Sequence, residues 1–166
     1  MRQLRYTFVL LFLNILFLNC SFAAITNLSS PLDTTTGNNT PTGIYFNNDG
    51  SKVFVLGSNG NGGDRDSIIE YSLSTAYDVS TASGTTQSLI VDGGIGSVLG
   101  FTSLHPFGLT FNGDGSKVYV ADGNLDKIFE ITLGSNFDLT SSATHTGTLN
   151  TDVSNGSDTP CGLTFN

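Results

Sequence analysis

Short apolar runs separated by Gly, Asn, Asp and Ser recur along most of the chain, and this pattern predicts β-strands. In residues 67–73 and 127–133, apolar side chains at every second position alternate mainly with polar ones, as in a half-buried strand. Residues 52–56 and 117–121 are rich in Val and aromatic residues, as in a strand buried between two layers. No segment after the first 23 residues has a sustained helical period, so the rest of the chain is predicted to be all-β. The strands expected in chain order are 43–47, 52–56, 67–73, 87–91, 108–112, 117–121, 127–133 and 145–149.

This pattern is an internal repeat. Residues 41–55 return as 106–120 with ten of fifteen positions identical, and residues 66–73 return as 126–133. A third copy begins at residues 159–166. Each Asp-Gly pair is expected to form a tight turn, since Gly tolerates positive φ and Asp accepts local backbone N–H bonds. We assign a structural role to the shared motif, whose residues are Pro41, Gly43, Phe46, Asp49, Gly50, Lys52, Pro106, Gly108, Phe111, Asp114, Gly115 and Lys117.

Repeats of four antiparallel strands are typical of β-propeller blades, which stack around a ring of four to eight. The chain has about two blades and the start of a third, so we expect an incomplete ring and a fragment of a longer product. The loops 57–65 and 92–104 are expected at one rim. The predicted organisation is a signal peptide (1–23), a lead-in (24–40), blade 1 (41–105), blade 2 (106–159) and the first strand of a truncated blade 3 (160–166).

The first residues predict export. Arg2 and Arg5 precede the apolar stretch 7–18, and small residues lead to a cleavage site after Ala23. Twelve apolar residues are short for a bilayer, so no membrane span is expected after cleavage, and the protein is predicted to be secreted or periplasmic. Lipid attachment at Cys20 is the alternative, although the preceding residues fit such a site poorly.

The net charge and the cysteine count limit the classes of partner and the covalent links that the sequence predicts. Removal of residues 1–23 changes the formal net charge from −8 to −10, which argues against nucleic acid and anionic membranes as partners. Neutral or cationic partners remain, with a protein or a carbohydrate as the expected ligand. Cys161 would be the one cysteine of the mature chain, which excludes an intrachain disulfide, and we expect it to be buried as a small hydrophobe.

The segment from Phe111 to Asp122, a strand followed by Asp-Gly and then by Val-Tyr-Val, resembles the YVTN/lactonase-like and NHL group of β-propellers. The resemblance covers residues 41–83 and 106–143 well. It implies the propeller fold but no single activity, since the group includes secreted binding proteins and lactonases. Residues 77–83 resemble the end of a longer repeat found in exported bacterial proteins.

Candidate chemistry is sparse. Oxygen ligands alternate from Asp122 to Asp126 as at the start of a Ca²⁺ loop, but Lys127 and Leu133 replace the Gly and Glu of an EF-hand, and a loop between strands is the better interpretation. His105 differs from the Thr in the other copies, so it is a candidate position for function outside the shared scaffold, but polar surface is its expected role. His145 is expected to be polar surface, and Glu70 and Glu130 are expected to face outward or cap the repeat.

No catalytic residue, ligand-binding residue, metal ligand or cofactor is assigned. The sequence favours an exported, non-enzymatic binding or scaffold module. The alternative is a metal-dependent lactonase-like hydrolase whose site lies in missing blades.

Overall fold

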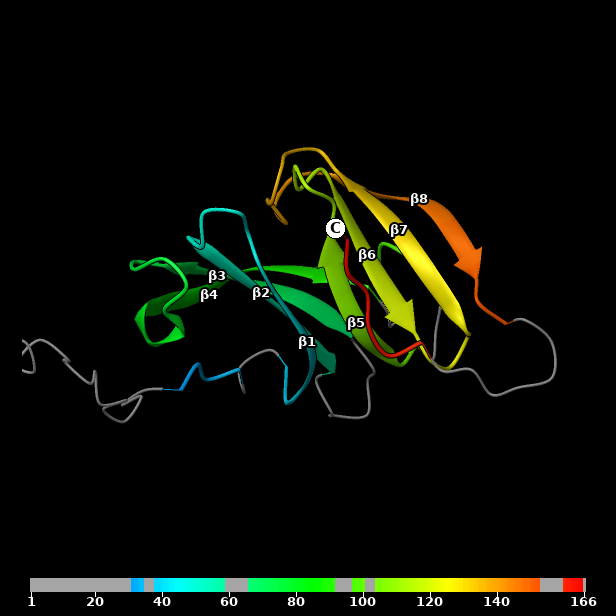
Figure 1. The fold of residues 1–166 in the computed structure, drawn as a ribbon, viewed down its shortest axis with the longest axis horizontal. Helices are drawn as coiled ribbons and strands as arrows, with labels where there is room; N and C mark the ends of the chain where they lie inside the picture. The colour runs from blue at the N-terminus through cyan, green and yellow to red at the C-terminus, as the bar shows by residue number, and fades with distance from the viewer. Residues whose placement is uncertain are drawn as a thin grey trace, which may run out of the picture. The chain divides into compact units, whose positions relative to one another are not determined.

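The computed structural model describes residues 31–34, 38–58, 66–91, 97–100, 104–152 and 160–165, with backbone alone at 84–87. The described chain is all-β, as predicted, and forms two four-stranded antiparallel sheets with one short 3-10 helix at Val79–Thr81 (Figure 1). Sheet 1 has the order β1-β2-β3-β4 and sheet 2 the order β5-β6-β7-β8, so each strand pairs with the next along the chain. The strands are β1 (Thr40–Phe46), β2 (Lys52–Ser58), β3 (Ser67–Leu73), β4 (Ala82–Ile90), β5 (Pro106–Phe111), β6 (Lys117–Asp122), β7 (Lys127–Leu133) and β8 (Ala143–Asn150).

The turn between the first two strands of each sheet is built the same way in both repeats. The Asn47 side-chain oxygen accepts the Lys52 amide at 2.9 Å, and the Asp49 carboxylate accepts the Ser51 amide at 2.9 Å. In sheet 2, Asn112 and Asp114 bind the amides of Lys117 and Ser116 at the same 2.9 Å distances. Gly50 and Gly115 have φ values of 71° and 75°, a conformation that favours glycine. Both motif Asp residues therefore bind their own turns.

The Pro and Gly residues that open the motif lie near the start of the first strand of each sheet. The pairing of β1 with β2 is irregular between Pro41 and Gly43, and the pairing of β5 with β6 is irregular between Pro106 and Gly108. A Cβ atom at Gly43 would lie 3.2 Å from the Leu109 Cβ, so glycine allows β1 and β5 to approach closely. In Figure 1 these two strands lie next to each other at the centre of the described chain.

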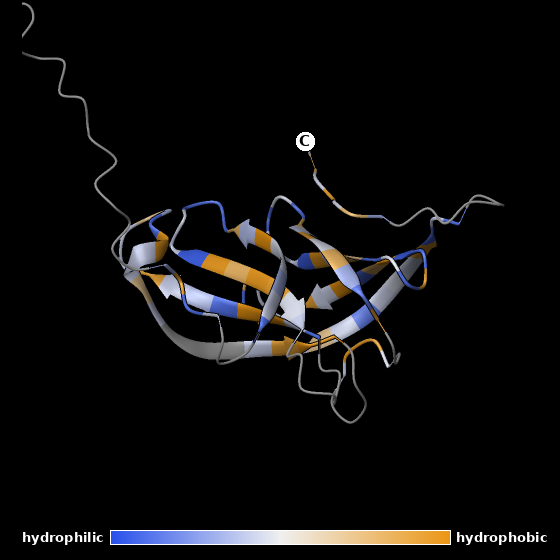
Figure 2. Ribbon diagram, turned by 90° about the horizontal axis from the view of Figure 1, so that it is seen from below, coloured by the Kyte–Doolittle hydropathy of each residue, from blue (hydrophilic) through white to orange (hydrophobic). Residues whose placement is uncertain are grey.

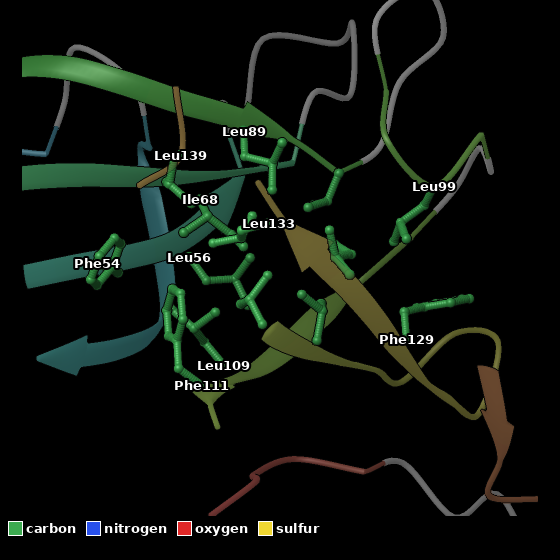
Figure 3. Packing of buried hydrophobic residues seen from close by; sticks show 14 of the residues in the cluster. Phe54, Leu56, Ile68, Leu89, Leu99, Leu109, Phe111, Phe129, Leu133 and Leu139 are labelled. Carbon is green, nitrogen blue, oxygen red and sulfur yellow. The ribbon is translucent and has the colours of Figure 1, made fainter. Parts of the chain in front are cut away.

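The core lies between opposite faces of the two sheets. Sheet 1 contributes Phe54, Leu56 and Ile68 (Figure 3). Sheet 2 contributes Val118 and Val120, which match Val53 and Val55 in the repeat. Since successive side chains of a strand point to opposite faces, the two repeats use opposite faces for this contact. The other face of sheet 1 forms a second cluster, whose buried members are Val53, Val55, Ile69, Tyr71 and Leu73. Successive repeats thus stack in the same sense, which means that the face of one repeat that contains Phe54 packs against the opposite face of the next repeat, which contains Val118. The apolar residues concentrate on the strands (Figure 2).

Two segments outside the sheets pack against them. The side-chain nitrogen of the buried Asn38 donates to the carbonyls of Val55 and Ser67 at 3.0 and 3.2 Å, which ties the lead-in to β2 and β3. At the other end, residues 160–165 run beside sheet 2 (Figure 1), where the Phe165 ring lies 4.8 Å from the Tyr119 ring. Among the described residues no helix is long and apolar enough to cross a membrane. The predicted signal peptide lies outside the described residues.

Candidate functional site

A pocket of about 280 Å³ opens where β1 and β5 begin. Residues 59–65, 92–96 and 101–103 lie outside the described chain, but residues that flank both predicted rim loops line this one pocket: Ser58 and Asp66 from the first loop, Leu104 from the second. We call it the rim pocket. Its lining consists of Thr40, Thr42, Ser58, Asp66, Leu104, His105, Pro106 and Phe107.

His105 is held at the pocket by its backbone. Its amide donates to the Asp122 carboxylate at 2.5 Å, and its carbonyl accepts the Gly123 amide at 3.0 Å. Asp122 is fully buried and also accepts the amides of Asn124 and Leu125 at 3.1 and 2.7 Å. This carboxylate therefore caps the turn between β6 and β7 and anchors the segment before β5, which supports the loop interpretation over a Ca²⁺ loop.

The pocket wall combines polar groups with exposed apolar surface. Asp66 is 4% exposed, and its backbone carbonyl accepts the Val91 amide at 2.8 Å, which fixes the chain just before β3. Phe107 is 38% exposed although it belongs to a strand. Hydroxyl groups and one carboxylate beside an exposed ring suit a polar, uncharged ligand that also has apolar faces.

The described part of the chain has no cluster of metal-ligating side chains. No group of three or more His, Cys, Asp or Glu side chains there is placed to hold a metal ion.

His145, which the sequence predicts to be polar surface, is half-buried, and its ring stands edge-on to Phe129 at 5.8 Å. Cys161 is exposed, so the prediction of a buried thiol is wrong. It lies in the described segment 160–165, which has no strand assignment.

A second site lies between the sheets. The Lys52 ammonium contacts the Glu70 carboxylate at 2.6 Å and donates to the Phe137 carbonyl at 2.6 Å. Glu70 in turn accepts the Leu139 amide at 3.2 Å. We call Lys52 and Glu70 the Lys–Glu clamp, because together they bind the turn between β7 and β8 at both a carbonyl and an amide. Glu70 is 5% exposed, so of the two alternatives expected for this residue the outward orientation is wrong.

Sheet 2 has the equivalent pair. The Lys117 ammonium donates to the Glu130 carboxylate at 2.9 Å, and the Thr146 hydroxyl donates to the same oxygen at 2.8 Å. These bonds hold the pKa of Glu130 below its usual range, and the Glu130 carboxylate raises the pKa of Lys117. The Lys117 and Glu130 side chains are 38% and 26% exposed, against 28% and 6% for Lys52 and Glu70.

The sequence alone did not point to Asn38, Asp66 or the clamp as functional positions. The one signal for the clamp was the recurrence of Lys and Glu at matching positions in both repeats. Comparison of the chain with protein-family models, with curated proteins and with solved structures finds no match.

Proposed function

We propose that the chain is part of an exported, non-enzymatic repeat protein whose sheets stack as β-propeller blades and which binds a ligand at the rim pocket. The observation that supports stacking is the order of the faces: the Phe54 face of one repeat packs on the Val118 face of the next. A propeller needs this same-sense order, because every blade contacts a neighbour on each side. The YVTN/lactonase-like and NHL resemblance of the motif agrees with this arrangement.

The ligand class follows from the pocket and the charge. A net charge of −8 disfavours anions, and the pocket presents Thr40, Thr42 and Ser58 beside the exposed Phe107 ring. Sugars have hydroxyl groups for such partners and C–H faces that pack on aromatic rings. We therefore propose a neutral carbohydrate as the ligand.

The experiment is a titration of the full chain with tetrasaccharides of glucose, N-acetylglucosamine and xylose, followed by calorimetry. Binding of one of them, lost in Phe107→Ala, is the expected result. Phe165→Ala is the matched control, since it removes another exposed ring that does not line the pocket. Absence of binding to all three, or binding that Phe107→Ala leaves unchanged, would overturn this ligand assignment.

Export is tested separately. N-terminal sequencing of the mature protein should begin at Ala24, whereas an uncleaved or lipidated N-terminus would contradict secretion by signal cleavage. The metal-dependent hydrolase has no supporting observation among the described residues, and it stays a prediction from the resemblance.

A further inference from the structure

Matching positions in the two sheets differ sharply in exposure. Leu89 pairs with Ile68 in sheet 1 and is 9% exposed, whereas Leu149 pairs with Ile128 in sheet 2 and is 61% exposed. Leu89 is covered because it faces the core between the two sheets. Leu149 belongs to the face of sheet 2 that points away from sheet 1, together with Tyr119 and Glu130.

On this outer face of sheet 2, residues 160–165 take the place that β5 takes on sheet 1. Phe165 corresponds to Phe111 in the repeat, and its ring lies 4.8 Å from Tyr119 as the Phe111 ring lies 4.6 Å from Phe54. A Cβ atom at Gly108 would lie 3.1 Å from the Gly162 Cα, an approach similar to that of Gly43 and Leu109. Residues 160–165 therefore lie on sheet 2 as β5 lies on sheet 1.

The two sheets differ at the place where the turn between the third and fourth strands of the next repeat would pack. In the contact between the sheets, the Phe137 ring lies 6.5 Å from Tyr45 and 6.3 Å from Phe54, next to the Lys–Glu clamp. Around Lys117 and Glu130, the described residues supply only partners from sheet 2 itself, and a groove of about 370 Å³ runs past Tyr119, Glu130, Leu149 and Phe165. Its floor is the outer face of sheet 2, and one wall is the 160–165 segment.

We propose that this groove is the docking site for the turn between the third and fourth strands of a further repeat unit of this kind. Such a turn has an aromatic residue, an Asp and an aliphatic residue in sequence, as in Phe137–Leu139 and Tyr77–Val79. Lys117 binds the carbonyl of the aromatic residue, and Glu130 accepts the amide of the aliphatic residue two positions later. Continuity with the existing contact between the sheets selects this occupant, because residues 160–165, which match the first strand in the repeat, already lie on this face.

The Asp of the turn shapes it for docking through hydrogen bonds within the turn. Asp138 accepts the Thr140 amide at 2.8 Å, and Asp78 accepts the Ser80 amide at 3.0 Å. Phe137 and Tyr77 both have positive φ, at 53° and 61°, and their amides donate to Gly115 and Gly50 respectively, each at 2.9 Å. A turn with this internal bonding presents its carbonyl and amide in one geometry. The inference rests on the stacking part of the proposed function and not on its carbohydrate ligand.

The test compares the full chain with an extended chain, in which a second copy of residues 113–152 follows Asn166. Amide hydrogen exchange is measured at the appended copy of Leu139. We expect this amide to be protected, and Lys117→Met or Glu130→Ala to speed its exchange about tenfold, the effect of losing one charge-assisted hydrogen bond. Lys52→Met is the reference variant, since it should speed exchange at the original Leu139 and leave the appended amide protected.

Three results would overturn the proposal. The first is exchange of the appended amide at the unfolded rate while sheet 2 stays protected, and the second is protection that neither Lys117→Met nor Glu130→Ala changes. The third is a dimer of the unextended chain that Lys117→Met abolishes, which would assign the groove to a second copy. Carbohydrate titration of the same extended chain separates the two proposals, because Lys117→Met leaves the rim pocket intact.

Discussion

The Glu70 carboxylate accepts a hydrogen bond from the backbone amide of Leu139, 69 residues later in the chain, at 3.2 Å. The bond joins β3 of one sheet to the turn after β7 of the other, and Lys52 completes it by contacting both Glu70 and the Phe137 carbonyl. A main-chain turn is thus recognised by an ion pair, which does not depend on the side chains of the turn. The same pair can therefore join repeats whose surface residues differ.

Loss of the clamp lysine should have different costs in the two sheets. Lys52→Met leaves the nearly buried Glu70 without its counter-ion, and we expect a loss of about 2–3 kcal/mol, less than for a fully buried pair because Lys52 is partly exposed. Lys117→Met breaks a more exposed pair that solvent screens, so it should destabilise the chain much less than Lys52→Met. Urea denaturation of both variants measures this, and equal losses would show that the contact between the sheets adds nothing to the pair.

Gly115→Ala should destabilise the chain by about 2–4 kcal/mol. The residue has a φ of 75°, and a Cβ atom there would collide with the Phe137 ring, so backbone strain and overpacking add. Gly113→Ala, in the same turn, has no atom within 4 Å of the added Cβ and should change stability by less than about 0.5 kcal/mol. Similar losses for the two variants would contradict the close fit of Phe137 over the turn.

The repeated turns should make stability fall in acid. Hydrogen bonds from Ser51, Ser116 and Thr140 hold the pKa values of Asp49, Asp114 and Asp138 below the usual Asp range. A carboxylate with a lowered pKa stabilises the folded state above its unfolded pKa of about 3.9, and this contribution is lost as the pH falls through the lower folded value. Asp114→Ala should therefore flatten the dependence of unfolding free energy on pH below about pH 5. An unchanged slope would show that Asp114 makes no such bonds.

Asp122→Ala should destabilise the chain by about 2–4 kcal/mol, because three backbone amides lose a buried acceptor. Since the carboxylate is already bound to these amides, calcium titration of the unaltered chain should give no heat and no rise in melting temperature. Calcium-dependent stabilisation that Asp122→Ala removes would instead restore the Ca²⁺ loop interpretation.

The sequence predicted the local structure better than the contacts between repeats. Strands β3 and β7 have the predicted bounds, 67–73 and 127–133, since apolar residues alternate along them and an Asp precedes each strand. β4 and β8 begin earlier than predicted, at Ala82 and Ala143, because backbone pairing with β3 and β7 continues through residues with little apolar character.

The functional positions were harder to predict. Glu70 is polar and alternates with apolar neighbours, which indicates solvent exposure, and its burial depends on a turn from the other repeat. The rim pocket likewise combines Ser58, Asp66 and His105 from distant parts of the chain. Such contacts depend on how the sheets stack, which no local pattern encodes.

Stacking of successive repeats in the same sense is the central claim, and nuclear Overhauser effects between aromatic rings test it most directly. The Phe54 ring lies 4.6 Å from Phe111 and 6.3 Å from Phe137, centroid to centroid, so selective labelling of phenylalanine should give cross-peaks for both pairs. The Leu139 amide should also exchange slowly and lose this protection in Glu70→Ala. Intact cross-strand contacts within each sheet, without any Phe54–Phe111 or Phe54–Phe137 cross-peak, would contradict the stacking.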